Sequence, residues 1–320
     1  MGSKPLTRPP KLVPGSRVAL IAPAGPLLER DDLVRAQALC RALGYEPILG
    51  KNAYNHHGYL AGTDEQRLSD LNDALRDQTI DALWCIRGGY GVTRLLDQVD
   101  YAALRRRPKA VIGFSDITAL INALHRVTGT VTFHAPVARA AMPSFSRSHF
   151  ERVLSQTAAP GVLGRLPEPQ TTLIPQENRI VTLRGGTGEG PLAGGNLTLL
   201  QCLIGTPWFP DLTGAILFLE DVGEHLYRVD RALAHLRAVG ALQQLAGVVV
   251  GRFTDLQRGG RDGAMGLDHV LTHYLGPLKV PVASGFPIGH IDAQWTLPLG
   301  IRARLDADAG EVTLLDSAVI

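Results

Sequence analysis

The first half of the chain alternates short runs of β-branched and apolar residues with longer segments of helical periodicity. Strands are expected at residues 17–22, 46–49, 82–86, 110–114 and 130–133. A helix is expected at 32–43, closed by Gly44, and another begins at the capping-box pair Thr63 and Gln66. Strands that alternate with helices in this way predict an α/β domain whose parallel sheet is flanked by helices.

The periodicity fades in residues 157–183, where several prolines favour an extended connection. We therefore predict an N-terminal domain at 1–156, a linker at 157–183 and a smaller α+β domain at 184–320. In the second half the expected helices are 197–204 and 230–239, the expected strands are 215–219, 247–250 and 280–283, and 258–266 is expected to be an exposed loop.

Composition narrows the classes of function. The 320 residues are 45% hydrophobic and 19% charged, with a net charge of +2, and they hold no long basic run with interleaved aromatics. Nucleic acid is therefore not an expected partner.

No window approaches the roughly 20 apolar residues that a membrane span needs. The three cysteines, Cys40, Cys85 and Cys202, lie far apart, and residues 1–15 contain no apolar stretch of signal-peptide length, so we expect a cytoplasmic protein.

Ser115 is the first candidate for chemistry, because it follows the strand 110–114 and precedes a segment with apolar residues at helical spacing. Gly113 leaves room for the sharp turn of a nucleophile elbow, which projects a hydroxyl. Ile117 stands where the hydrolase consensus has a second glycine. The alternative is that Ser115 or Asp116 only caps the following helix.

A glycine-rich loop, Arg87-Gly88-Gly89-Tyr90-Gly91, follows another expected strand. Its backbone amides could stabilise an oxyanion, as acyl transfer requires. The same glycines could hold a phosphate or form a simple turn, although the loop lacks the lysine of a P-loop. Cys85 precedes this loop but lies inside the strand, and we interpret it as a buried core residue.

Glu220 and His290 are the remaining candidates. Glu220 ends an apolar strand, where an unpaired carboxylate would be costly. It either pairs with Arg228 or Arg231, is simply exposed at the strand end, or orients a catalytic imidazole. His290 follows a loop with two glycines around Pro287. The other histidines show no metal-binding spacing with carboxylates, which disfavours a metallopeptidase.

Taken together, the ordered motifs resemble the LD-carboxypeptidase family of serine peptidases, also called muramoyltetrapeptide carboxypeptidases, over nearly the whole chain. The matching segments are Val18–Pro23, Arg87–Gly91, Ile112–Asp116, Gly194–Leu197, Gly205–Trp208, Leu219–Asp221, Tyr227–Arg231, Gly289–His290 and Thr296–Gly300. The resemblance implies a Rossmann-like N-terminal domain, a smaller C-terminal domain and a homodimer.

By the same resemblance Ser115 is the nucleophile, His290 the general base and Glu220 the triad acid, and they meet across the domain cleft. The Gly89 and Asp116 amides would form the oxyanion hole. The implied substrate is a murein tetrapeptide ending in D-alanine, cleaved in cytoplasmic recycling of wall fragments without metal or organic cofactor. Arg87 is our candidate for binding the free carboxylate of the substrate.

Two other functions stay open at this point. One is an immunity-type serine peptidase, related to the microcin C self-immunity proteins, which cleaves a toxic aminoacyl-nucleotide conjugate. The other is a non-catalytic, two-domain α/β protein whose glycine loop binds an anion. It predicts that Ser115→Ala leaves function intact.

Overall fold

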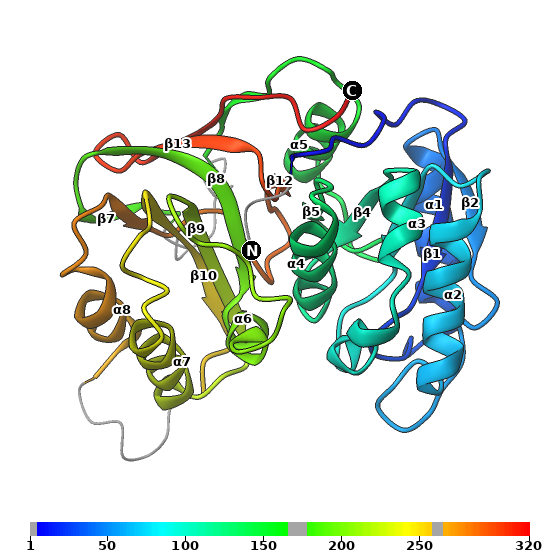
Figure 1. Cartoon of the computed structure of the whole chain (residues 1–320), viewed down its shortest axis with the longest axis horizontal. Coiled ribbons are helices and arrows are strands. Elements are labelled where there is room, and N and C mark those ends of the chain that lie inside the picture. Colours follow the sequence, from blue (N-terminus) through cyan, green and yellow to red (C-terminus); the bar gives the residue numbers. More distant parts are fainter. Residues whose placement is uncertain (1–4, 166–177, 258–264) are drawn as a thin grey trace, which may run out of the picture.

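The structure is a computed structural model that describes residues 5–165, 178–257 and 265–320. These residues form two β-sheets with helices packed around them, and Figure 1 shows the halves side by side, with α4 between them. The helices are α1 Arg30–Ala42, α2 Asp64–Arg76, α3 Tyr101–Arg106, α4 Ile117–Thr128, α5 Ser144–Leu154, α6 Leu197–Leu203, α7 Leu226–Ala238 and α8 Leu267–Leu275, with short 3-10 helices at Val92–Arg94 and Leu96–Gln98.

The first sheet has the strand order β12-β5-β4-β3-β1-β2. Its strands are β1 Arg17–Ile21, β2 Glu46–Leu49, β3 Ala82–Cys85, β4 Ala110–Gly113, β5 Phe133–His134 and β12 Leu297–Pro298. β1 to β5 pair in parallel, and β12 runs antiparallel to β5. The order reverses between β1 and β3, so the loops after these strands diverge and leave room for a ligand at their carboxyl ends.

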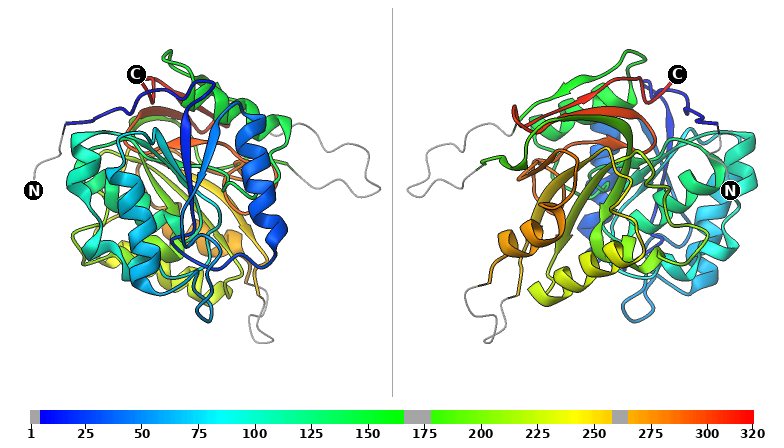
Figure 2. Two further views of the ribbon diagram at one scale, coloured as in Figure 1. Left: turned by 90° about the vertical axis from the view of Figure 1, so that its right-hand side faces the viewer. Right: turned by 60° about the vertical axis from the view of Figure 1, so that its left-hand side comes forward.

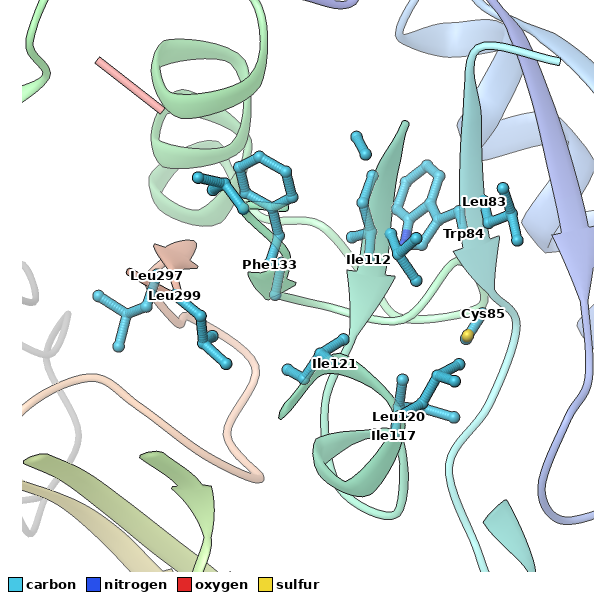
Figure 3. Packing of buried hydrophobic residues seen from close by; sticks show 14 of the residues in the cluster. Leu83, Trp84, Cys85, Ile112, Ile117, Leu120, Ile121, Phe133, Leu297 and Leu299 are labelled. Atoms are coloured by element: carbon cyan, nitrogen blue, oxygen red, sulfur yellow. The ribbon is translucent and has the colours of Figure 1, made fainter. Parts of the chain in front are cut away.

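Helices cover both faces of this sheet, with α1 and α2 on opposite sides of β1 and β2 (Figure 2, left). The apolar face of α4 packs against the strands, and Figure 3 shows Ile117, Leu120 and Ile121 on the side of α4 that turns toward β3 and β4. All three side chains are fully buried. This packing fixes the start of α4, and therefore the residues just before it, relative to the sheet.

The second sheet has the order β6-β14-β13-β8-β9-β10-β11-β7. Its strands are β6 Gly161–Leu163, β7 Val181–Arg184, β8 Thr187–Asn196, β9 Ile216–Val222, β10 Gly247–Thr254, β11 Val282–Ser284, β13 Arg302–Asp306 and β14 Glu311–Leu314. β8 to β11 are parallel, and the strands outside them are antiparallel. Thus β9 and β11 also present their carboxyl ends at one edge.

The predicted fold class, an α/β chain with a Rossmann-like parallel sheet, is confirmed, and most expected elements lie within a few residues of those observed. The ends of the expected linker 157–183 are strands and not an extended connection. β6 pairs with β14 and β7 pairs with β11, so both strands belong to the second sheet. Residues 166–177 of that linker and 258–264 of the expected exposed loop lie outside the described residues. The boundaries of the two domains stay a prediction.

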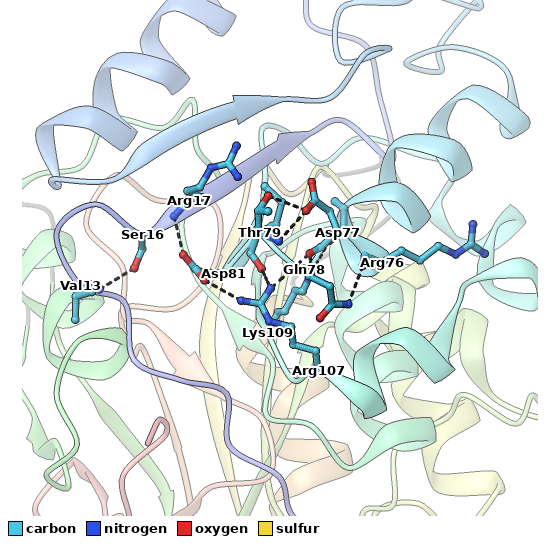
Figure 4. Close-up of polar contacts among 12 residues, drawn as sticks. Val13, Ser16, Arg17, Arg76, Asp77, Gln78, Thr79, Asp81, Arg107 and Lys109 are labelled. Atoms are coloured by element: carbon cyan, nitrogen blue, oxygen red, sulfur yellow. Dashed lines mark hydrogen bonds and ion pairs between the residues drawn. The ribbon is translucent and has the colours of Figure 1, made fainter.

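Lys109, just before β4, is a buried cation that caps a helix. Its Nζ donates to the carbonyl oxygen of Ala74 at 2.8 Å and to that of Asp77, at the C-terminal end of α2. Figure 4 shows Lys109 and the neighbouring Arg107 pointing into the turn after α2. The last carbonyls of a helix lack intrahelical partners and carry partial negative charge, so a cation stabilises them.

Candidate active site

Ser115 lies in the sharp turn between β4 and α4, at the carboxyl edge of the first sheet. Its φ angle is 65°, and among the described residues only Asp255 is another non-glycine residue with positive φ. This conformation is disfavoured for a residue with a Cβ, and it is typical of strained turns at functional sites. Ser115 is partly exposed, whereas Phe114 and Asp116 on either side are buried.

The residues around Ser115 explain the departure from the hydrolase consensus. A Cβ on Gly113 would lie 2.8 Å from Cγ2 of Ile117, so the glycine makes room for the isoleucine that replaces the second consensus glycine. The alternative that Asp116 caps the helix with its side chain is not observed. Asp116 is the N-cap residue of α4, but its side chain makes no capping hydrogen bond. Its Oδ2 accepts instead from the amide of Val92, at 2.9 Å.

The structure brings Ser115, His290 and Glu220 together in one hydrogen-bonded relay. His290 Nε2 lies 2.9 Å from Ser115 Oγ, and His290 Nδ1 lies 2.8 Å from Glu220 Oε2. Glu220 lies near the end of β9 and is fully buried, while His290 follows β11 with a side chain 21% exposed. Neither Arg228 nor Arg231 is the partner of Glu220, and Arg228 instead pairs with Glu224 at 3.5 Å.

This geometry sets the direction of proton transfer. An ionised carboxylate only accepts hydrogen bonds. The matching tautomer of His290 has its proton on Nδ1 and donates a hydrogen bond from there to Glu220. Nε2 is then free to accept the hydroxyl proton of Ser115. The ring of Phe114 lies 4.8 Å from that of His290 and restricts its orientation. A Cβ on Gly289 would lie 2.7 Å from Glu220 Oε2, so only glycine permits this approach.

Behind Phe114 lies His134, a fully buried histidine of β5 whose ring centroid is 5.7 Å from that of Phe114. Burial, together with the proximity of His290, lowers the pKa of His134 to about 3. It therefore stays neutral at ordinary pH and adds no positive charge beside the relay.

The glycine loop packs directly against the serine. A Cβ on Gly88 would lie 2.7 Å from Ser115 Cβ and 3.4 Å from the amide nitrogen of Asp116. Gly89 has a φ of 119° and packs against Gly25 in the loop after β1. Gly88 therefore lies against both the Ser115 side chain and the Asp116 amide, and Gly89 is the next residue of the loop.

Two buried side chains hold this loop in place. Nη1 of Arg67 donates to the carbonyl oxygen of Gly91 at 3.0 Å and also to that of Pro23. The Asp116 carboxylate holds Val92, the next residue. Burial raises the pKa of Asp116, although the bond from Val92 and the charge of Arg67 oppose this rise. The loop that borders the serine is thus fixed from two directions.

Comparison with known proteins assigns this arrangement to a family. The description "LD-carboxypeptidase N-terminal domain" matches residues 18–135, and "LD-carboxypeptidase C-terminal domain" matches residues 189–305. The chain belongs to the LD-carboxypeptidase family. The predicted family and the predicted enzyme class, a serine carboxypeptidase, are both confirmed.

Individual LD-carboxypeptidases and related proteins match over nearly their full length. The murein tetrapeptide carboxypeptidase of Pseudomonas aeruginosa is 36% identical over 299 residues, covering 91% of this chain and 94% of that protein. The crystal structure of a muramoyltetrapeptide carboxypeptidase from Oxalobacter formigenes aligns with a TM-score of 0.79 at 32% identity, covering 93% of this chain and 98% of that one. A microcin C7 self-immunity protein, known from Escherichia coli, aligns with a TM-score of 0.88 at 24% identity, covering 98% and 99%, and shows the same fold.

Arg87, our candidate for binding a substrate carboxylate, precedes Gly88 in this LD-carboxypeptidase. Its Nη1 donates to the carbonyl oxygen of Pro26, so part of the guanidinium is used within the protein. Burial and the charge of nearby Arg139 lower the pKa of Arg87, and Asp32, which pairs with Arg139 at 3.4 Å, partly offsets them. Two cationic side chains therefore lie close together beside the glycine loop.

Sequence reasoning missed Arg67, although a signal was present. Arg67 lies four residues before Leu71 in α2, on the face that packs against the sheet, and its side chain is fully buried. A cation on the apolar face of an expected helix needs partners, and here these are the Asp64 carboxylate, at 2.5 Å, and backbone carbonyls of the loops at the site.

Among the described residues no helix is both long enough and apolar enough to cross a membrane.

Proposed function

We propose that this chain is a serine LD-carboxypeptidase that hydrolyses the bond before the terminal D-alanine of murein tetrapeptides. The observation that carries the proposal is the relay from Glu220 through His290 to Ser115, with separations of 2.8 and 2.9 Å between the bonded atoms. The names of the Pseudomonas and Oxalobacter relatives support the choice of substrate. The two family domains matched at residues 18–135 and 189–305 contain all three residues.

The reaction begins when His290 Nε2 accepts the hydroxyl proton of Ser115. The Ser115 oxygen then attacks the carbonyl carbon that precedes the terminal D-alanine, and Glu220 stabilises the imidazolium that forms. Collapse of the tetrahedral intermediate breaks the C–N bond, and the proton on Nε2 moves to the leaving nitrogen. D-Alanine departs, and the shortened peptide stays bound to Ser115 as an ester.

Hydrolysis of this ester repeats the sequence with water. His290 accepts a proton from the water as its oxygen attacks, and the proton returns to the Ser115 oxygen when the ester breaks. In both steps we assign the Gly89 and Asp116 amides to the negative oxygen of the intermediate. The packing of Gly88, the residue before Gly89, against Ser115 and the Asp116 amide supports this assignment.

The free carboxylate of the substrate is assigned to Arg87, with Arg139 nearby to increase the positive potential. A guanidinium binds a carboxylate through paired hydrogen bonds, and this contact would select a chain end over an internal peptide bond. We also propose that the enzyme acts in the cytoplasm, in wall-fragment recycling, as a homodimer. The three cysteines are free thiols, which supports a reducing compartment.

The test is incubation with a defined murein tetrapeptide and mass detection of the tripeptide and free D-alanine. Wild type should release both products, and Ser115→Ala should lower kcat by at least about 10⁴-fold because the nucleophile is lost. Ser148→Ala is the matched control, since Ser148 is an exposed serine of α5. Undiminished cleavage by Ser115→Ala would refute the assignment of the nucleophile.

The same assay separates the alternatives. An aminoacyl-nucleotide conjugate supplied in place of the tetrapeptide tests the immunity-type activity suggested by the shared fold. Cleavage of the conjugate alone, still dependent on Ser115, would replace our substrate and keep the chemistry. Binding of peptide without turnover, unchanged in Ser115→Ala, would indicate the non-catalytic protein.

A further inference from the structure

The nucleophile and its two partners come from different halves of the chain. Ser115 follows β4 of the first sheet, whereas Glu220 lies near the end of β9 and His290 follows β11, both in the second sheet. A displacement of about 1 Å between reacting groups can cost about 10²-fold in rate, so the two halves must be held in register. The contact that does this should lie near both Ser115 and Glu220.

The first turn of α4 makes such a contact with the end of β8. Oγ1 of Thr118, three residues after Ser115, accepts a hydrogen bond from the amide of Asn196 at 3.1 Å. One turn later, Nδ2 of Asn122 donates to the carbonyl oxygen of Gly194 at 3.0 Å and to that of Thr118 at 2.8 Å. Thr118, Asn122 and Asn196 are all buried, so water does not compete for these bonds.

Two glycines of β8 make room at this contact, Gly195 for the helix α4 and Gly194 for the neighbouring strand β9. A Cβ on Gly195 would lie 2.7 Å from Thr118 Oγ1 and 2.6 Å from its Cγ2. A Cβ on Gly194 would lie 2.0 Å from the carbonyl oxygen of Phe218 in β9. We call Thr118, Asn122, Gly194, Gly195 and Asn196 the α4–β8 seam. Figure 1 shows α4 beside β8 and α6 at the middle of the molecule.

The seam continues to the strand end that carries Glu220. Asn196 is paired with Glu220 in the register of β8 and β9. Its Nδ2 donates to Oδ1 of Asp221 at 2.8 Å, while its Oδ1 accepts from the amide of Leu199 at 3.1 Å and caps α6. Oδ2 of Asp221 accepts from the amide and the hydroxyl of Thr198, at 3.0 and 2.9 Å. Asp221, next to Glu220, is therefore held on both oxygens.

We propose that Thr118 and Asn196 are positioning residues that set the distance between Ser115 and the Glu220–His290 pair. They act through the backbone: Thr118 fixes the turn that bears Ser115, and Asn196 fixes the end of β9. This inference rests on the proposed function only in requiring that the three residues act together. It explains the motif Gly194-Gly195-Asn196, whose residues take no direct part in the proposed reaction.

The test compares Thr118→Val with Thr118→Ser. Valine keeps the shape but removes the acceptor, leaving the Asn196 amide buried and unpaired, whereas serine keeps the hydroxyl. We expect Thr118→Val to lower kcat about ten-fold or more with KM within about two-fold, and Thr118→Ser to retain most of the wild-type rate. Asn196→Ser, which keeps a capping oxygen but is too short to reach Asp221, should show the same loss.

A second readout does not depend on the murein substrate. A fluorophosphonate forms a P–O bond with the serine oxygen and loses fluoride, while the hydroxyl proton passes to His290. Its second-order rate should fall in Thr118→Val and Asn196→Ser, with melting temperatures near that of wild type. If wild type leaves the tetrapeptide uncut but this pattern holds, the substrate is wrong and the positioning role stands.

Wild-type kcat and labelling rates in folded Thr118→Val would overturn the proposal. So would equal losses in Thr118→Val and Thr118→Ser, because the hydroxyl would then not be the relevant group. If Thr118→Val does not fold, the kcat and the labelling rate of Asn196→Ser decide. A loss in both supports the proposal, and wild-type values in the folded variant overturn it.

Discussion

At the scale of single residues, the site depends on backbone conformations that most side chains disfavour. Ser115 has positive φ, and such a conformation costs of order 1–3 kcal/mol unless its surroundings hold it. Here the buried Asp116 carboxylate and Arg67 fix the loop on one side, and the apolar start of α4 fixes the other. The strain aims the hydroxyl at His290 before any substrate arrives.

Gly89 is where this dependence can be measured. Gly89→Ala would place a Cβ 2.8 Å from the Gly25 Cα, at a φ of 119° that alanine rarely adopts, so the loop must move. We expect kcat on the tetrapeptide to fall on the order of 10²-fold to 10³-fold, as when one oxyanion donor is lost.

Gly15→Ala is the matched control, because Gly15 also has positive φ, at 87°, but has no atom within 4 Å of an added Cβ. It should cost some stability and leave kcat unchanged. A Gly89→Ala enzyme that is folded and fully active would remove Gly89 from the oxyanion hole.

The sequence alone singled out Ser115, Glu220 and His290 as candidates, and the structure brings them together. The local pattern left a second interpretation for each residue. A serine that caps a helix and a serine nucleophile have the same neighbours in the sequence, and so do a structural and a catalytic glutamate at a strand end. Only the ordered resemblance to a family chose between them. Arg67, Thr118 and Asn196 were not assigned roles, since each has partners in segments distant in sequence: Arg67 at Gly91, Thr118 at Asn196, and Asn196 at Asp221 as well.

At the scale of elements, strands and helices with a strong pattern of their own were predictable. β2 was expected at the observed residues, and the capping box at Thr63 and Gln66 is present. By contrast, β7 is largely exposed and β6 has one buried residue, and both exist because they pair with β11 and β14. β12 has two residues and adds to a sheet built far earlier in the chain. Such strands are specified by their partners more than by their own sequence.

The junction of α2 and β4 gives a prediction for stability. Burial lowers the pKa of Lys109 to about 8, from 10.5. Between these values the folded protein binds fewer protons than the unfolded chain, so the free energy of unfolding should rise with pH across this window. Below about pH 8 the cost of burying the charge is present in full.

The measurement is urea unfolding of wild type and Lys109→Met from pH 7 to 10.5. We expect the difference in unfolding free energy, wild type minus variant, to increase with pH, because methionine has no proton to lose. Lys51→Met, at a lysine whose side chain is 85% exposed, is the control for the loss of a surface lysine. A flat or falling difference for Lys109→Met would contradict the lowered pKa.

At the scale of the whole molecule, the two halves share one hydrophobic core. A single cluster of buried residues includes Ile112 and Phe133 of the first sheet together with Phe218 and Leu305 of the second. The C-terminal end also returns to the first half, where the amide of Ile320 donates to the carbonyl oxygen of Pro9. The relay therefore spans halves that are packed against each other.

We propose that His290 and Glu220 activate Ser115 across the junction of these halves. The most direct measurement is mass mapping of the residue labelled by a fluorophosphonate, with its rate in wild type, His290→Ala and Glu220→Gln. We expect phosphonylation of Ser115 in wild type, almost none in His290→Ala and a strongly reduced rate in Glu220→Gln. A label on another residue, or equal labelling of Ser115 in all three proteins, would contradict it.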